Sequence, residues 1–267
     1  MQKNPRVCIV RTAGTNCDKE TAFAFSQVGA DPVLVHVNDL VRGKDSLANY
    51  QILALSGGFS YGDDIASGKI FANELKCKLA VDLRSFIANG KLIIGICNGF
   101  QILVKSGLLP GNPELKQEAS LIINDSGKFE DRWIYLKKGG KCIWTKNISE
   151  IIYLPVAHGE GKFIVQDKKV LEQLKKHGQI VFQYCNKEGK LSGYPDNPNG
   201  AMDNIAGISD ETGRILGLMP HPERHIRVSQ HPRWSAALDK MKGLSFLEAG
   251  DGLQIFRNGV EYVKKNL

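Results

Sequence analysis

Residues 91–103 read KLIIGICNGFQIL, an apolar run that passes directly into a helical stretch ending at Gly107. Gly95 and Gly99 stand two residues before and two residues after Cys97. This spacing predicts a nucleophile elbow, a strand-to-helix turn so tight that side chains at the two flanking positions would clash. The turn would present the thiol at a helix N-terminus, where the helix dipole favours a thiolate. We therefore interpret Cys97 as a nucleophile and not as an inert buried cysteine.

The segments before the elbow predict an α/β fold. Short apolar runs at 6–11, 32–37 and 51–58 are typical of strands in a parallel sheet that is covered on both faces. A helical stretch ends at Gly29, and a second helix is expected over 71–88. This alternation indicates a doubly wound, mostly parallel sheet, whose ligands bind beyond the carboxyl ends of the strands.

The second half of the chain predicts a different kind of β structure. From about 117 to 165 the runs are short and alternating, which indicates an antiparallel β insertion or edge. A helix is expected over 167–177, and the runs QIVFQY, NIAGISD and RILGLMPH give further strands, with a hairpin turn at 211–213. The C-terminal stretch predicts an amphipathic helix. Its apolar stripe consists of Leu253, Phe256, Val260, Val263 and Leu267.

Length and composition point to an ordinary globular protein with one large α/β domain or two small ones. Apolar residues make up 42% of the 267 residues and charged residues 24%. The net charge of +7 comes from scattered lysine pairs, which we interpret as solvated faces and not as a nucleic-acid site. No signal or membrane segment is apparent, so a cytoplasmic location is expected. The six cysteines show neither a disulfide nor a zinc pattern, and no metal site is expected.

A thiol nucleophile needs a base, and the run LGLMPHPER supplies His221 directly after an apolar strand. Glu223 follows two residues later, where it can orient the imidazole, and Pro220 and Pro222 stiffen the backbone around it. Either residue alone would be unremarkable at a strand end. Histidine after one core strand and cysteine after another favour a Cys97, His221 and Glu223 triad.

Donors for an oxyanion are expected after the third strand, in the run LSGGFSYGDD. Gly58 can direct its backbone N–H into a cleft, and the N–H of Asn98, the residue after the nucleophile, is the second candidate. Among the other histidines, His158 is the best alternative base. It opens the turn HGEG, which can line a pocket or be a simple tight turn.

Taken in order, these motifs resemble the class I, triad-type glutamine amidotransferases. The match is closest to the family of glutaminase subunits of phosphoribosylformylglycinamidine synthase. The similar segments span nearly the whole chain: GTNCDKE (14–20), GGFSYGDD (57–64), GICNGFQILVKSGLLPG (95–111), HGEGKF (158–163), NPNGAMDNIAGI (197–208) and MPHPERH (219–225).

The resemblance implies a flavodoxin-like fold and an enzyme that releases ammonia from glutamine in purine synthesis, through a Cys97 thioester. It also implies a single amidotransferase domain, 1–267, with a C-terminal extension of unassigned role from about residue 226. It implies a partner, a large synthetase subunit that binds ATP and Mg and converts formylglycinamide ribonucleotide to the amidine, with a small third subunit in some complexes. No cofactor is expected in this chain. Gln101, Phe59 and His158 are the residues expected to contact glutamine.

Three alternatives remain open at this point. The chain is the glutaminase subunit of another amidotransferase, a cysteine hydrolase of the α/β-hydrolase type, or a binding module that has kept the fold without activity. In α/β-hydrolases the acid precedes the histidine in the chain, whereas Glu223 follows His221. This order favours the amidotransferase, and the presence of all three triad residue types argues against a loss of activity.

Overall fold

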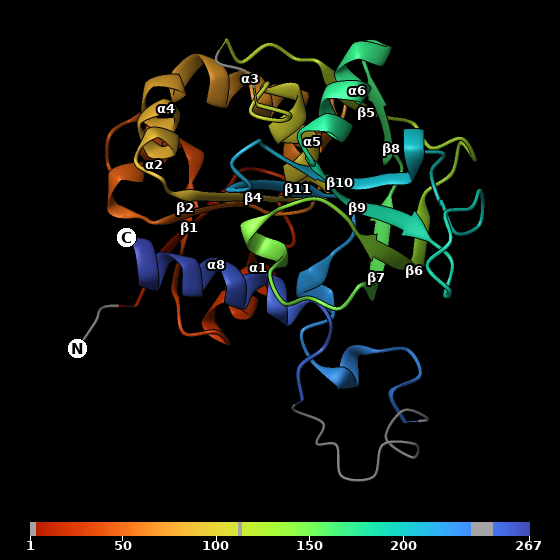
Figure 1. The fold of residues 1–267 in the computed structure, drawn as a ribbon. Helices are drawn as coiled ribbons and strands as arrows, with labels where there is room; N and C mark the ends of the chain where they lie inside the picture. The colour runs from red at the N-terminus through yellow and green to blue at the C-terminus, as the bar shows by residue number, and fades with distance from the viewer. Residues whose placement is uncertain (1–3, 112–113, 236–247) are drawn as a thin grey trace.

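The fold is organised around one nine-stranded sheet, seen edge-on in Figure 1. The computed structural model describes residues 4–111, 114–235 and 248–267. The strands lie in the order β2 (Asp31–His36), β1 (Arg6–Arg11), β3 (Ile52–Leu55), β4 (Leu92–Ile96), β11 (Ile215–Leu218), β10 (Ile205–Ser209), β9 (Ile180–Cys185), β6 (Glu130–Lys138) and β7 (Ile151–His158).

The first five strands in this order, β2 to β11, are parallel to one another. β3 and β4 are buried along their whole length, as continuous apolar runs in a covered parallel sheet should be. Leu218 of β11 pairs with Ile96 of β4, so the carboxyl ends of these two strands lie next to each other. The parallel half confirms the expected doubly wound sheet.

The other four strands, β10, β9, β6 and β7, pair antiparallel and extend the sheet beyond β11. They confirm the expected antiparallel extension. A separate two-stranded sheet is formed by β5 (Ala119–Ile122) and β8 (Lys162–Val165). The run 151–165 is therefore divided between two sheets by the HGEG turn.

Helices cover both faces of the parallel half. Figure 1 shows α1 and α8 on one face, and α3, α4 and α5 on the other. No helix in the described part of the chain is both long and apolar enough to cross a membrane. The helices are α1 (Asp18–Ser26), α2 (Val37–Val41), α3 (Lys69–Lys78), α4 (Ala80–Ala88), α5 (Asn98–Lys105), α6 (Lys168–Lys176) and α8 (Leu253–Asn266).

Two expectations need correction. The helix expected over 71–88 is two helices, because Leu79 between them has φ −122° and ψ 13°, outside the helical region. Leu79 is buried, and neither glycine nor proline marks the break in the sequence. Leu267, assigned to the apolar stripe of the last helix, is 55% exposed, since α8 ends at Asn266. The extension from about residue 226 lies partly outside the described residues.

Helix α8 docks on the sheet through a close contact with Trp144. Gly259 faces the indole ring, and Asn258 Nδ2 donates a hydrogen bond to the Trp144 carbonyl at 2.8 Å. On the same helix, Phe256 meets Phe25 of α1 edge-on, with ring centroids 5.0 Å apart. The absence of a side chain at Gly259 allows the helix to approach this closely.

We predict that Gly259→Ala destabilises the protein, although alanine normally favours a helix over glycine. The new Cβ would lie 2.4 Å from the Trp144 ring, and overpacking of this kind costs about 1–3 kcal/mol. Urea unfolding measures the free energy. Gly193→Ala, where no atom lies within 4 Å of the added Cβ, is the control and should change little. A stabilised Gly259→Ala protein would show that the contact does not limit packing.

Candidate active site

Cys97 occupies the elbow between β4 and α5. Its backbone has φ 52° and ψ −106°, a conformation that costs a non-glycine residue about 1–3 kcal/mol. Backbone hydrogen bonds hold the turn at both the N–H and the carbonyl of Cys97. The Cys97 N–H donates to Leu218 O at 2.8 Å, and the Cys97 carbonyl accepts from the N–H groups of Phe100 and Gln101. The strain is therefore offset by the neighbouring strand and by the first turn of α5.

The two glycines of the elbow are required by close contacts. A Cβ on Gly99 would lie 1.9 Å from the Leu55 carbonyl oxygen of β3. A Cβ on Gly95 would lie 2.6 Å from the Gly99 carbonyl oxygen. Both obstacles are backbone atoms, which cannot move aside as the end of a side chain can. These distances explain physically why the sequence has glycine on both sides of Cys97.

His221 and Glu223 form a buried pair just beyond β11. Pro222 begins the 3-10 turn Pro222–Arg224, and this turn brings the Glu223 carboxylate back to the imidazole. His221 Nδ1 and Glu223 Oε1 are 2.6 Å apart. Because a carboxylate only accepts, Nδ1 carries the proton and Nε2 is left to act as a base. The main chain of His221 is fixed by its N–H, which donates to Pro155 O of β7 at 2.8 Å.

The imidazole and the thiol meet at Gly57, in the loop after β3. A Cβ on Gly57 would lie 2.8 Å from His221 Cε1 and 3.5 Å from Cys97 Cβ, so both side chains border the same point. Burial tends to lower the pKa of His221, but the negative charges of Glu223 and Cys97 outweigh it and raise the pKa well above the usual value. Within the described residues, His221 Nε2 is buried and has no hydrogen-bond partner.

Two backbone N–H groups expected to stabilise an oxyanion are available. Neither Gly58 N nor Asn98 N donates a hydrogen bond to another described residue. The Gly57 carbonyl, in the same peptide as Gly58 N–H, accepts from Asn16 N at 3.4 Å and Cys17 N at 3.2 Å. The orientation of this peptide therefore depends on the loop that follows β1.

Gln101, in α5, and Phe59, in the loop after β3, have different surroundings. Gln101 is buried. Its Oε1 accepts from Asn98 Nδ2 at 2.9 Å, and its Nε2 donates to Glu160 O at 2.7 Å. Phe59 is 46% exposed, with its ring 6.4 Å from that of Phe129. Gln101 thus ties the elbow helix to the HGEG turn, while Phe59 lies at the surface beside the candidate oxyanion donor.

His158 is buried, and both of its ring nitrogens are engaged. Nδ1 lies 3.2 Å from Asn124 Oδ1, and Nε2 lies 3.4 Å from Asn199 Nδ2. Burial and the positive charge of His221 lower the pKa of His158 to about 3. A neutral imidazole with both nitrogens occupied is poorly suited to act as the base or to bind a substrate, so the geometry favours a structural role in the HGEG turn.

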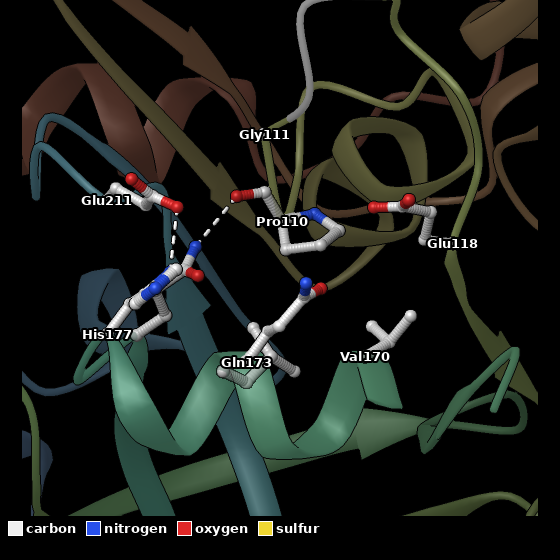
Figure 2. A pocket seen from close by; sticks show the side chains of 9 residues that line it. Pro110, Gly111, Glu118, Val170, Gln173, His177 and Glu211 are labelled. Atoms are coloured by element: carbon white, nitrogen blue, oxygen red, sulfur yellow. Dashed lines mark hydrogen bonds and ion pairs between the residues drawn. The ribbon is translucent and has the colours of Figure 1, made fainter. Parts of the chain in front are cut away.

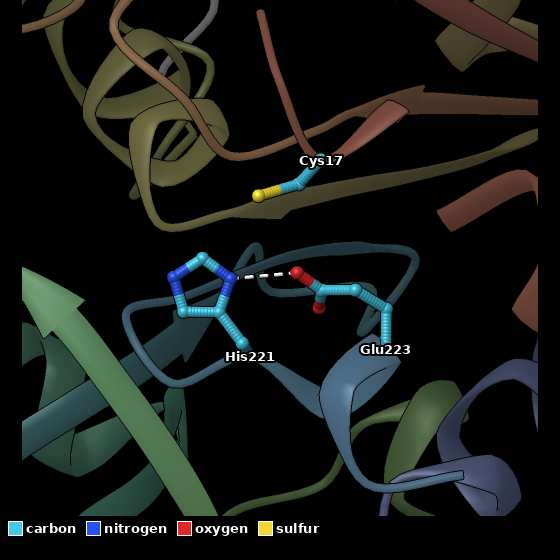
Figure 3. A group of neighbouring side chains, drawn as sticks. All are labelled: Cys17, His221 and Glu223. Carbon is cyan, nitrogen blue, oxygen red and sulfur yellow. Dashed lines mark hydrogen bonds and ion pairs between the residues drawn. The ribbon is translucent and has the colours of Figure 1, made fainter. Parts of the chain in front are cut away.

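Cys17, at the N-terminus of α1, is a site residue to which the sequence analysis gives no role. Figure 3 shows its sulfur above the His221 ring, on the side away from the backbone of His221. Its Sγ, a His221 ring nitrogen and a Glu223 oxygen lie within 4.8 Å of one another. Cys17 follows a strand of the parallel half, so the rule that ligands bind at carboxyl ends is the signal that could have found it.

These three donors do not form a convincing cation site. A tetrahedral zinc ion lies about 2.0–2.3 Å from each ligand atom, so its ligands must converge on one point. The Glu223 carboxylate instead lies against Nδ1 of His221, the nitrogen opposite the free one.

A cavity of about 290 Å³ lies away from this site, between α6 and the loop after α5. Figure 2 shows two pairings among the polar groups that line it. His177 Nδ1 lies 2.8 Å from Glu211 Oε1, and Gln179 Nε2 donates to Pro110 O at 2.8 Å. The described residues that line this cavity include no thiol.

Comparison with known proteins agrees with this geometry. The family described as CobB/CobQ-like glutamine amidotransferase domain matches residues 4–263. Phosphoribosylformylglycinamidine synthase subunit PurQ of Dehalococcoides mccartyi is 48% identical over 263 residues, covering 97% of this chain and 98% of that protein. The PurQ subunit of Archaeoglobus fulgidus is 41% identical, with 97% of each chain covered.

A solved structure supports the same relationship. A chain in the structure of PurLQS from Thermotoga maritima superposes with a TM-score of 0.72 at 30% identity, covering 97% of this chain and 99% of that one. This likeness confirms the class I glutamine amidotransferase fold expected from the sequence. The chain belongs to the glutamine amidotransferase family and, within it, to the family of phosphoribosylformylglycinamidine synthase PurQ subunits.

Proposed function

We propose that this chain is the glutaminase subunit of phosphoribosylformylglycinamidine synthase, with Cys97 as nucleophile, His221 as base and Glu223 as orienting residue. The observation that carries the catalytic assignment is the convergence of the strained elbow at Cys97 with the buried pair of His221 and Glu223. Family membership favours this reading over a cysteine hydrolase of the α/β-hydrolase type.

The first half of the reaction forms a thioester. The thiol proton passes to His221 Nε2, and Cys97 Sγ attacks the side-chain amide carbon of glutamine. The N–H groups of Gly58 and Asn98 stabilise the oxyanion that develops. His221 then returns the proton to the leaving nitrogen, and the C–N bond breaks to release ammonia.

The second half regenerates the thiol. His221 takes a proton from water, and the resulting hydroxide attacks the thioester carbon. The C–S bond breaks to release glutamate, and His221 passes its proton to the departing sulfur, which restores the Cys97 thiol. Glu223 holds the imidazole with Nδ1 protonated in both halves, so that Nε2 always faces the reacting atoms. Gln101, in α5, and Phe59, in the loop after β3, are the residues proposed to contact the bound glutamine.

The ammonia is used on another subunit. The Thermotoga relative is solved as PurLQS. We accordingly assign to this chain a large synthetase partner, with a small third subunit in the complex. ATP and Mg belong to the synthetase, where formylglycinamide ribonucleotide becomes the amidine, and this chain carries no cofactor of its own. All six cysteines are free thiols, which suits a cytoplasmic location.

We predict that Cys97→Ser abolishes glutamine-dependent synthesis by the assembled complex and leaves ammonia-dependent synthesis nearly intact. Only the nitrogen supply requires the thiolate. The two rates are measured on one preparation, with glutamine or ammonium chloride as nitrogen source. Loss of both activities would contradict the division of labour between the subunits.

Glu223→Gln should lower the glutaminase rate less than His221→Ala does. The carboxylate orients and stabilises the imidazole, whereas the imidazole itself moves the protons. Steady-state glutamate production by complexes carrying each variant provides the comparison. Equal or reversed losses would show that the two roles are wrongly assigned.

The subunit alone should hydrolyse glutamine slowly and accelerate when it docks on its synthetase. The Gly57 carbonyl is held by the loop after β1, and a change in that loop would reorient the Gly58 N–H. Loss or gain of one oxyanion donor changes a rate by roughly 100-fold or more. Glutaminase rates with and without the large subunit loaded with nucleotide and formylglycinamide ribonucleotide test this. Equal rates would eliminate this form of control.

A further inference from the structure

Cys17 is buried, yet its sulfur has polar surroundings. Arg224 Nη2 donates to Cys17 Sγ at 3.1 Å, and the thiol lies 3.1 Å from Asn16 Oδ1. Cys8 offers a contrast, because it lies within the core strand β1, and burial raises its pKa strongly. A cysteine that only filled space would resemble Cys8. The Cys17 thiol instead has polar contacts with Arg224 and Asn16.

The backbone of Cys17 holds the peptide between Gly57 and Gly58, whose N–H is a proposed oxyanion donor. Its N–H donates to the Gly57 carbonyl at 3.2 Å. Because C=O and N–H point in opposite directions across a trans peptide, this bond also sets the direction of the Gly58 N–H. The backbone bond does not depend on the side chain, so substitutions of Cys17 test the sulfur alone.

The sulfur of Cys17 contacts the base. A Cβ on Gly57 would lie 3.2 Å from Cys17 Sγ and 2.8 Å from His221 Cε1, which places the thiol beside the ring (Figure 3). Glu223 restrains the ring only at Nδ1, while Nε2 has no hydrogen-bond partner in the described part of the chain. The Cys17 side chain is in position to provide a second contact that fixes the tilt of the imidazole.

We propose that Cys17 is a positioning residue for glutamine hydrolysis, its thiol held by Arg224 and set against the His221 imidazole. The inference rests on the proposed function of this site. Cys17 forms no bond to the substrate and undergoes no chemical change in this role. The carboxylate of Glu223 and the sulfur of Cys17 together fix the ring, so that Nε2 faces the Cys97 thiol.

A titration effect accompanies this geometry. The sulfur of Cys17 is one of the groups that raise the pKa of His221, after Glu223 and Cys97 and against the effect of burial. Removing the sulfur lowers that pKa, so the imidazolium is lost at a lower pH than in the unaltered protein. Since the imidazolium donates the proton to the leaving ammonia, the alkaline limb of the rate profile follows this pKa.

The test uses the assembled complex with Cys17→Ala, Cys17→Ser, Arg224→Met and the double variant Cys17→Ala with Arg224→Met. Cys8→Ala is the matched control, a buried cysteine of the same size within β1. For each complex, glutamine-dependent and ammonia-dependent rates are measured, together with the pH dependence of kcat/KM for glutamine. Urea unfolding reports any loss of stability separately.

We expect Cys17→Ala to lower the glutamine-dependent kcat roughly tenfold with little change in KM, as a misplaced catalytic group would. Its alkaline limb should move to lower pH, and Cys17→Ser should recover part of both effects. Arg224→Met should also lower the glutamine-dependent kcat, because it removes the donor that holds the Cys17 thiol, and the double variant should lose less kcat than the product of the single losses. Ammonia-dependent rates and Cys8→Ala should be unchanged.

Two results would overturn the inference. One is a Cys17→Ala profile that matches the unaltered complex in kcat and in its alkaline limb. The other is multiplicative losses in the double variant, which would mean that Arg224 does not act through the sulfur. In either case, loss of glutamine-dependent synthesis in Cys97→Ser would leave the proposed function standing, whereas full activity in Cys97→Ser would remove that function itself.

Discussion

The approach of α5 to the end of β3 sets the position of everything else at the site. Gly99 lies so close to the Leu55 carbonyl that no side chain fits between them. This contact forces the chain to reverse at Cys97 with a positive φ, and the reversal directs the thiol outward from the sheet. The loop that carries Gly57 and Gly58 follows Leu55 directly, so the same contact fixes the distance between Cys97 and the proposed oxyanion donors.

Buried polar groups hold the surrounding loops. The side chain of Asn98 accepts from the N–H and hydroxyl of Ser60, and donates to Asp63 at 3.0 Å and Gln101 at 2.9 Å. An amide buried without such partners would cost about 1–3 kcal/mol, so each bond favours one arrangement of the loop over its alternatives. The elbow, the oxyanion loop and the HGEG turn therefore behave as one polar assembly.

The sequence predicted the features that depend on local spacing. The strands of the parallel half, the elbow and the pairing of His221 with Glu223 follow from short runs of residues, and the structure contains all of them. The features that sequence reasoning missed depend on contacts between distant segments. Cys17 meets Arg224 across 207 positions, and no local pattern records such a contact. The break between the two helices at Leu79 is likewise not marked by a glycine or a proline, so no local pattern predicts it.

The hydrogen bond from the His221 N–H to the Pro155 carbonyl means that the antiparallel extension of the sheet helps to position His221. Pro155 belongs to β7, the outermost strand of the sheet, whereas His221 follows β11 in its centre. His221, the proposed base, is therefore held between the middle of the sheet and its edge strand. Local unfolding of the edge strand β7 would displace His221 while the parallel half of the sheet stayed folded. A substitution in β7, far from Cys97 in the sequence, would then lower activity in an assay as a substitution of His221 or Glu223 would.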